Sequence, residues 1–277
     1  MQCRPVMDIH QIQKAIIEHV AAAPCKITPW LLEKTITDTY RLNKPRTRAL
    51  LKDLVARGEL QYAYQFGSTY LVPSFNKPVR ISAQVVITPP EHQYLRAPGD
   101  VVIQIKPGVA FGGGQHPTTR LAVRGIEHVL GGSGPMPPGS RSRALDIGTG
   151  SGILVLAAVQ FGIKKGLGLD IDPIARVEAR ENVKLNDLEK HIEITDCSLT
   201  SIRRQFCLVT ANLRLPSLQR WCQKLARLTL PNGFLVFSGI RVQEAEDLLN
   251  TYANHHCHRL WQAEELGWTG LVLQRSV

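Results

Sequence analysis

The sequence predicts an α/β protein: a doubly wound, mostly parallel sheet of seven strands with an antiparallel edge, preceded by a small domain of three helices and a hairpin. Three observations support this prediction. Strand-like and helix-like segments alternate from residue 143 onward, a glycine-rich turn follows the first of those strands, and helical spacing dominates residues 9–57. With 277 residues, the chain has room for two domains and can bury a core that needs no disulfide or metal.

Residues 1–75 are expected to form a separate N-terminal domain. Helices are predicted over residues 12–20, 29–39 and 45–57, followed by a hairpin over 59–72. Thr28 is suited to cap the second helix, and Pro24 is expected to end the first. Three helices and a hairpin resemble a winged-helix domain, and the segment 48–60 resembles the third helix of such a domain leading into its wing.

Basic residues gather before and along the third predicted helix, and their role has two interpretations. They are Arg41, Lys44, Arg46, Arg48 and Lys52. They could contact the phosphates of a nucleic acid, or they could be a solvated face on a domain that docks proteins. Residues 1–75 carry +4 of the formal net charge of +10, so the charge is not concentrated on this domain.

The second segment, residues 76–117, is predicted to be a β-rich bridge. Strands are expected over 79–86 and 101–106, separated by prolines. Further on, a Gly/Pro/Ser-rich stretch over 131–140 predicts a flexible connector with no chemistry of its own.

The last segment, residues 118–277, is expected to hold the main sheet. Strands are predicted over 143–147, 166–171, 191–195, 208–211, 233–238, 260–263 and 269–273, and helices over 118–130, 152–161, 173–185, 216–228 and 242–252. No helix separates the last two strands, so they predict an antiparallel pair at one edge of the sheet.

A glycine-rich turn over 148–152 follows the first strand of this sheet. It is either part of a ligand site or an ordinary turn between a strand and a helix. Asp170 comes 22 residues after Gly148 and ends the next strand, where a carboxylate can accept both ribose hydroxyl protons. The G-x-G-x-G spacing and Asp146 before the turn favour S-adenosylmethionine over a nicotinamide dinucleotide. S-adenosylmethionine is cationic, which suits a carboxylate, and it has no pyrophosphate to place on the helix N-terminus. Asp146 is expected either to orient the turn or to meet an ammonium group.

Four motifs together resemble one family. They are F-G-G-G-Q-H-P-T-T at 111–119, D-I-G-T-G-S-G-I-L at 146–154, G-L-D-I-D-P at 168–173 and A-N-L at 211–213. Over about residues 100–277 the chain resembles the methyltransferases of large-subunit ribosomal protein eleven. The resemblance implies a Rossmann-like sheet and a class I S-adenosylmethionine-dependent methyltransferase that acts on lysine or α-amino groups of a protein. It also implies a set of cofactor contacts, namely Thr119, Gly148, Gly150, Asp170 and Asn212.

The residue types agree with these implied roles. Thr118 and Thr119 begin a predicted helix, so their hydroxyls and free N–H groups can hold a carboxylate. Asn212 ends a predicted strand, and its amide can align a neutral amine. His116 is expected to orient this loop or the substrate, whereas Asp172 is expected to begin a helix. No residue stands out as the base that deprotonates the acceptor amine.

The sequence departs from the family pattern at two informative places. The family carries a substrate-recruiting α/β domain where residues 1–75 resemble a winged helix, which leaves the acceptor open. Arg214 follows Asn212 where the family has apolar residues, and its charge is expected to disfavour a cationic substrate. Two alternatives therefore stand beside a protein methyltransferase: a nucleic-acid methyltransferase that reads RNA or DNA through residues 1–75, and a non-enzymatic regulator that senses S-adenosylmethionine.

Composition predicts a cytoplasmic protein without a metal site or a membrane span. The six cysteines are dispersed, with no C-x-x-C pair, which is typical of single thiols in a reducing compartment; they are Cys3, Cys25, Cys197, Cys207, Cys222 and Cys257. The run over 255–258 contains three histidines and a cysteine, but adjacent side chains point in different directions and do not predict a functional metal site. The longest apolar stretch, near 152–163, is too short to cross a bilayer.

Overall fold

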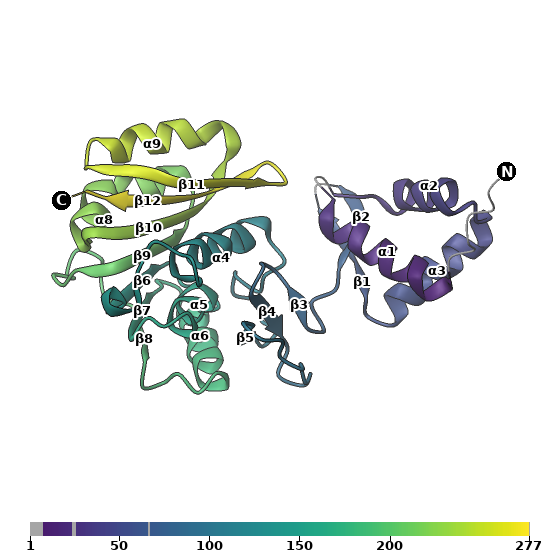
Figure 1. Cartoon of the computed structure of the whole chain (residues 1–277), viewed down its shortest axis with the longest axis horizontal. Coiled ribbons are helices and arrows are strands. Elements are labelled where there is room, and N and C mark those ends of the chain that lie inside the picture. Colours follow the sequence, from purple (N-terminus) through teal and green to yellow (C-terminus); the bar gives the residue numbers. More distant parts are fainter. Residues whose placement is uncertain (1–7, 24–25, 66, 277) are drawn as a thin grey trace. The chain divides into compact units, whose positions relative to one another are not determined.

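The computed structural model describes residues 8–23, 26–65 and 67–276. The chain divides into two compact units, Met1–Lys77 and Pro78–Val277 (Figure 1). Within the described ranges no helix is both long and apolar enough to span a membrane.

The N-terminal unit contains three helices and a two-stranded antiparallel hairpin. Its elements are α1 (Ile9–Ala22), α2 (Pro29–Tyr40), α3 (Lys44–Ala56), β1 (Leu60–Gln65) and β2 (Ser68–Pro73). Thr28 caps α2 as expected, since its hydroxyl accepts a hydrogen bond from the backbone N–H of Leu31 at 3.3 Å. The predicted helices and hairpin are confirmed to within three residues at each end, while Pro24 lies outside the described residues.

One apolar core holds this unit together. Residues from all three helices and both strands are buried in it, including Ile16, Leu32, Leu54, Leu60 and Leu71. The core is small, but it draws on every helix and strand described in the unit, and these elements have the packing expected of a separate domain.

A three-stranded sheet begins the C-terminal unit and corrects the predicted strand over 79–86. That segment forms two short strands, β3 (Val79–Arg80) and β4 (Val85–Thr88), which pair antiparallel. The chain reverses between them because the Ser82 hydroxyl accepts a hydrogen bond from the Val85 N–H and the Ile81 N–H donates to the Val85 carbonyl. β5 (Val101–Gln104) then pairs parallel with β4.

The main sheet has seven strands in the order β11-β12-β10-β9-β6-β7-β8. Its strands are β6 (Arg143–Ile147), β7 (Lys165–Leu169), β8 (Ile192–Thr195), β9 (Phe206–Asn212), β10 (Thr229–Arg241), β11 (Cys257–Glu265) and β12 (Trp268–Arg275). Five neighbouring strands, β8, β7, β6, β9 and β10, are parallel, and β12 and β11 form the antiparallel edge. The predicted seven-stranded, mostly parallel sheet is confirmed.

Helices cover both faces of this sheet (Figure 1). They are α4 (Pro117–Leu130), α5 (Ile153–Gln160), α6 (Pro173–Leu185), α7 (Leu215–Arg220), α8 (Cys222–Leu228) and α9 (Ala245–Ala253). The helix predicted over 216–228 is instead α7 and α8, separated at Trp221, where the backbone turns to φ −99° and ψ 5°. The helix predicted from Val242 begins as a single 3-10 turn over Val242–Glu244.

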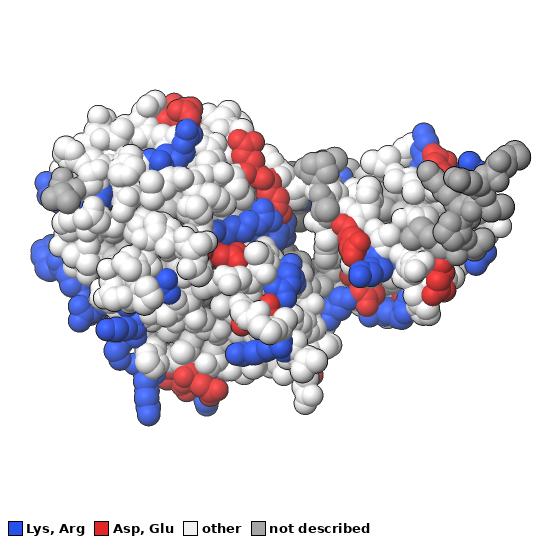
Figure 2. All heavy atoms as spheres, in the orientation of Figure 1, with Lys and Arg blue, Asp and Glu red and all other residues white. Residues whose placement is uncertain are grey.

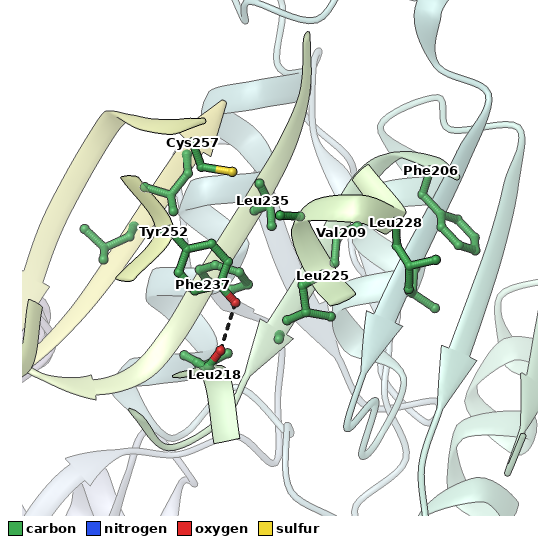
Figure 3. Packing of buried hydrophobic residues seen from close by; sticks show 14 of the residues in the cluster. Phe206, Val209, Leu218, Leu225, Leu228, Leu235, Phe237, Tyr252 and Cys257 are labelled. Atoms are coloured by element: carbon green, nitrogen blue, oxygen red, sulfur yellow. Dashed lines mark hydrogen bonds between the residues drawn. The ribbon is translucent and has the colours of Figure 1, made fainter. Parts of the chain in front are cut away.

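A large apolar cluster packs α7, α8 and α9 against one face of the sheet (Figure 3). Phe237 of β10 contacts Tyr252 of α9, with ring centroids 4.9 Å apart. The Tyr252 hydroxyl donates to the Leu218 carbonyl of α7 at 3.0 Å, drawn as a dashed line in Figure 3. Strands buried on both faces have near-continuous apolar runs, as β10 does over Phe234–Phe237.

The connector over 131–140 was expected to be flexible, but contacts with the body of the unit hold it in place. Met136 is buried, and its carbonyl accepts two hydrogen bonds from the Arg141 guanidinium. The same guanidinium donates to the Phe161 carbonyl after α5. Composition alone missed this because the anchoring arginine lies just outside the Gly/Pro-rich stretch.

Candidate functional site

The glycine-rich turn links β6 to α5 at the carboxyl edge of the sheet. Gly148 and Gly150 adopt φ values of +67° and +55°, which disfavour other residues. A Cβ atom on Gly150 would lie 2.2 Å from the Phe111 carbonyl oxygen, and one on Gly148 would lie 2.8 Å from the Leu213 side chain. The turn therefore needs glycine for its backbone conformation and for the close approach of the segment around Phe111.

Asp146, on β6 just before this turn, holds the turn through its carboxyl group. Its side chain is fully buried and accepts hydrogen bonds from the hydroxyls of Thr149 at 2.6 Å and Thr210 at 2.7 Å. Burial raises the pKa of the Asp146 carboxyl to about 6, against the opposing effect of those two hydroxyls. Of the two expected roles, the geometry supports orientation of the turn, because the carboxyl faces hydroxyls and is closed to solvent.

Asp170 lies directly after β7 and is joined to the glycine-rich turn. Its carboxylate accepts the Gly150 N–H at 2.9 Å and the Asp172 N–H at 3.0 Å, and the residue is half-buried. Asp172 caps α6, accepting the Ile174 N–H at 2.9 Å, so its interpretation as a helix start is confirmed. The structure thus brings Gly148, Gly150 and Asp170 to one place.

The segment Phe111–Thr119 packs beside the turn and ends in α4. The Ser151 N–H donates to the Phe111 carbonyl at 2.9 Å, which ties the two segments together. His116 caps α4, with Nδ1 3.3 Å from the Thr118 N–H nitrogen and 2.8 Å from the Thr118 hydroxyl. The imidazole also lies against Phe111 and Trp268, with ring centroids 5.2 Å and 5.1 Å apart, so it orients this loop.

Asn212 meets Thr118 of α4 across the sheet edge, and Thr119 follows it in the first turn of the helix. The Asn212 side-chain N–H donates to the Thr118 hydroxyl at 3.1 Å. The Thr119 hydroxyl is buried, and among the described residues it has no hydrogen-bond partner. An unpaired buried hydroxyl is costly, so its presence beside Thr118 points to a polar ligand group at this helix terminus.

Two charged contacts that sequence spacing did not reveal hold this loop. Arg120 donates to the Gly114 and Gln115 carbonyls and pairs with Glu265 at the end of β11, which also accepts from Arg124 at 2.7 Å. These partners are separated by more than a hundred residues, and the sequence carries no signal that pairs them.

Glu178 of α6 anchors the preceding stretch of the same loop. Its carboxylate accepts the N–H groups of Val109 and Ala110 at 2.9 Å and 3.0 Å. The loop before Phe111 is therefore held from α6, just as the loop after it is held from β11.

An aromatic and cationic cluster borders Asn212 on the side of β10. Arg214 donates to the Gly239 carbonyl and pairs with Glu244 at 3.2 Å. The guanidinium carbons of Arg214 and Arg241 lie 5.2 Å and 3.8 Å from the centroid of the Trp268 ring. Arg214 was expected near the site. Trp268 was missed because only the antiparallel edge of the folded sheet brings it here, and Arg241 was missed because β10 continues three residues beyond its predicted end at residue 238.

These residues converge where the strand order reverses. β7 and β8 follow β6 on one side, whereas β9 and β10 lie on the other, so the β6–β9 boundary is the topological switch point. Ligands of open α/β sheets bind outside the carboxyl ends of the strands at that point. Gly148, Asp170 and Asn212 follow β6, β7 and β9 or end them, which makes this edge the candidate site.

Comparison with known proteins matches the part of the chain that contains this candidate site to one protein family. A family model described as ribosomal protein L11 methyltransferase (PrmA) matches residues 73–276. The ribosomal protein L11 methyltransferase of Geotalea daltonii is 35% identical over 200 residues, covering 71% of this chain and 64% of that protein. The one from Citrifermentans bemidjiense is 39% identical over 205 residues, covering 73% and 64%. The chain thus spans less than two thirds of the length of these relatives.

A solved structure agrees with the sequence matches. The ribosomal protein L11 methylase of Lactobacillus delbrueckii subsp. bulgaricus superposes with a TM-score of 0.63 at 28% identity, covering 73% of this chain and 100% of that one. The family model begins at residue 73, so the helices α1 to α3 lie outside it.

Proposed function

This chain belongs to the ribosomal protein L11 methyltransferase family, and on that premise we propose that it transfers methyl groups from S-adenosylmethionine to amino groups of a protein. The observation that carries the proposal is the joined arrangement of the glycine-rich turn, Asp170 and the threonines of α4 at the switch point. The names of the relatives specify a ribosomal protein as acceptor, and a ribosomal protein is the acceptor class we propose here.

The residues at the site fit S-adenosylmethionine. The Asp170 carboxylate retains lone pairs beyond its two backbone contacts and would hold the ribose hydroxyls. Gly148 and Gly150 would let the nucleoside approach the backbone, and the buried Thr119 hydroxyl with the N-terminus of α4 would hold the methionine carboxylate. When bound, the cofactor supplies a methyl group already activated on a sulfonium cation.

Asn212 is the residue that we propose aligns the acceptor amine. Its N–H group is fixed by the Thr118 hydroxyl, which leaves the amide oxygen to accept a hydrogen bond from the amine. A lysine amine has a pKa near 10.4 and must lose a proton before it can attack. Asp146 does not remove that proton, because its carboxyl is buried against Thr149 and Thr210. The protein's work at this step is therefore positioning of the amine.

The N-terminal unit is proposed to be a winged-helix domain, residues 1–75, that presents the protein acceptor to residues 118–277, with residues 76–117 between them. Residues 1–72 lie outside the family match, so acceptor choice in this chain need not follow that of the relatives. We place the protein in the cytoplasm, on the strength of its dispersed cysteines.

The decisive experiment measures methyl transfer and cofactor binding separately. Tritiated S-adenosylmethionine is incubated with the full chain and a ribosome-containing lysate, and the protein and RNA fractions are counted. We expect label in protein. Calorimetry is expected to show S-adenosylmethionine binding that Asp170→Ala weakens at least about tenfold and Asp247→Ala, at an exposed carboxylate of α9, leaves unchanged. Binding without label in either fraction would favour a sensor, and absence of binding would refute the proposal.

A nucleic-acid acceptor is the second candidate, favoured by the surface of the N-terminal unit. Arg41, Lys44, Arg46 and Lys52 are exposed, and within the described part of the chain no carboxylate pairs with them. Three aromatic side chains of the same unit are also exposed: Trp30 by 69%, Tyr62 by 54% and Tyr64 by 74%. Exposed cations with aromatic rings suit phosphates and bases.

The second candidate has its own test. RNA affinity should fall steeply as salt rises and should drop further in Arg46→Ala with Lys52→Ala. In Figure 2, acidic side chains accompany the basic ones on the visible face of this unit, and that mixture favours the protein acceptor. A flat salt dependence, or RNA affinity that the double substitution leaves unchanged, would remove RNA from consideration.

A further inference from the structure

The cluster beside Asn212 leaves one cation without a counter-charge. Glu244 pairs with the Arg214 guanidinium at 3.2 Å and also accepts the Arg241 backbone N–H. The Arg241 guanidinium itself lies over the Trp268 ring, 3.8 Å from its centroid. Across residues 8–23, 26–65 and 67–276, no carboxylate is within ion-pair distance of that guanidinium. The half-buried Arg241 side chain is therefore held in place by an aromatic ring and still has its donors to offer.

This cation lies on the acceptor side of the proposed site. The glycine-rich turn and Asp170 follow β6 and β7, which leaves the carboxyl ends of β9 and β10 on the other side of the switch point. Asn212 ends β9, and Arg241 ends β10 beside it, three residues beyond Ser238, the partner of Asn212 in the parallel register. The Gly239 carbonyl between them accepts from Arg214.

The same cluster touches the loop of the proposed cofactor site through Trp268. The indole contacts the His116 imidazole at 5.1 Å, and His116 in turn contacts the Thr118 hydroxyl. Two side chains, Trp268 and His116, thus connect Arg241 to Thr118 at the start of α4, where the methyl donor is proposed to bind. The indole ring holds the Arg241 guanidinium in place, so the arginine side chain has little conformational freedom left to lose when a ligand binds.

We propose that Arg241, supported by Trp268, binds a carboxylate of the acceptor next to the amine that is methylated. This inference rests on the proposed function and names its substrate class: protein segments in which the target amine has an acidic neighbour. A planar guanidinium binds a carboxylate bidentately, and a half-buried position strengthens the contact relative to an exposed pair. A segment flanked by lysine or arginine would instead meet the uncompensated Arg241 guanidinium and be disfavoured.

The test uses two short peptides that have one central lysine flanked by glutamates in one and by glutamines in the other. Their affinity for the full chain is measured by fluorescence anisotropy without the methyl donor, so that the result does not depend on turnover. We expect the glutamate peptide to bind about threefold to tenfold more tightly at low salt, and the difference to shrink as salt rises. Rates of methyl transfer measured afterwards should show the same preference in KM.

Three variants assign the preference to Arg241. Arg241→Gln should bring the ratio of the two affinities to about one, whereas Arg259→Gln, an exposed arginine of β11 paired with Glu246, should leave it unchanged. Glu244→Gln frees the Arg214 charge and should raise the ratio. Thermal unfolding of each variant checks that it is folded.

Each outcome bears on one claim. Equal affinities of the two peptides for the unmodified protein, or a ratio that survives Arg241→Gln in a folded variant, overturn the inference. Loss of the preference in Arg241→Gln together with a rise in Glu244→Gln supports it. Failure of S-adenosylmethionine to bind would refute the proposed function, while the peptide ratio would still decide whether Arg241 selects a carboxylate.

Discussion

Replacing Gly150 by alanine tests whether the glycine-rich turn and the segment around Phe111 form one site. Gly150 has φ +55°, and a Cβ atom there would lie 2.2 Å from the Phe111 carbonyl oxygen. Because that contact is with backbone, no rotamer change relieves it. The Phe111 segment must move away, which breaks the hydrogen bond from the Ser151 N–H to the Phe111 carbonyl.

The expected cost has two parts. A left-handed conformation costs a non-glycine residue about 1–2 kcal/mol, and the lost hydrogen bond adds about 1 kcal/mol. Gly150→Ala should therefore lower the free energy of unfolding of the C-terminal unit by about 2–3 kcal/mol. For a domain of this size, that corresponds to a fall in melting temperature of roughly 4–12 °C.

Gly152→Ala is the matched control. Gly152 also has a positive φ, +86°, but its Cβ would meet only Ala179 of α6 at 3.4 Å. Gly152→Ala should lower the free energy of unfolding only by the cost of the left-handed conformation, about 1–2 kcal/mol, without moving the Phe111 segment. Both variants are measured by thermal unfolding and by calorimetric titration with S-adenosylmethionine.

The cofactor titration separates the two glycines. Gly150→Ala displaces the loop that leads to Thr118 and Thr119, so its dissociation constant should rise at least about tenfold, which is 1.4 kcal/mol. Gly152→Ala should change it by less than about threefold. Equal dissociation constants for the two variants would refute the reasoning, because they would show that the Phe111 segment does not contribute to the site.

Three further predictions concern the groups around the site. The pKa of Asp146 is about 6 in the folded protein and 3.8 in the unfolded chain, so the folded state binds the proton more tightly. The stability that this group contributes is fully present below pH 3.8 and is lost as the pH rises through 6. Urea unfolding should show that this loss, on the order of 3 kcal/mol, is absent in Asp146→Asn; an equal pH dependence in the two proteins would contradict it. Glu265→Gln should weaken the contacts of Arg120 and Arg124, lower stability by about 1–2 kcal/mol and raise the S-adenosylmethionine dissociation constant, whereas Glu264→Gln at the exposed neighbour should do neither. Tyr252→Phe removes the buried hydrogen bond to the Leu218 carbonyl and should lower the melting temperature by about 2–4 °C without altering cofactor binding, since it lies in the core and not at the site; a change in that binding would count against the placement of the site.

Element types along the main sheet were predictable because local pattern and burial agree there. β6 over Arg143–Ile147 and α6 over Pro173–Leu185 have the bounds expected from their apolar periods and caps. The prediction was wrong over 79–86, where a continuous apolar-rich stretch hides a reversal made by the Ser82 hydroxyl. It was also wrong at Trp221, which no proline or glycine marks as a helix end.

The site was predictable wherever its residues follow strand ends. Gly148, Asp170 and Asn212 could be placed together because parallel strands bring their carboxyl ends to one edge of a sheet. Glu265 and Trp268 could not be placed, because they reach the candidate site from the antiparallel edge, and strand order alone decides that approach. Arg241 ends the parallel strand β10, three residues beyond the strand end that was predicted at residue 238.

Sequence by itself determined the seven-stranded architecture, the glycine-rich turn with its acid, and the family over residues 73–276, because each depends on short spacings that any correct fold preserves. Tertiary structure decided which groups are satisfied and which are not. Asp146 is occupied by two hydroxyls, the Thr119 hydroxyl is buried with no partner among the described residues, and the Arg241 guanidinium rests on Trp268. Such differences arise from contacts between residues far apart in the chain, which strand order and packing create.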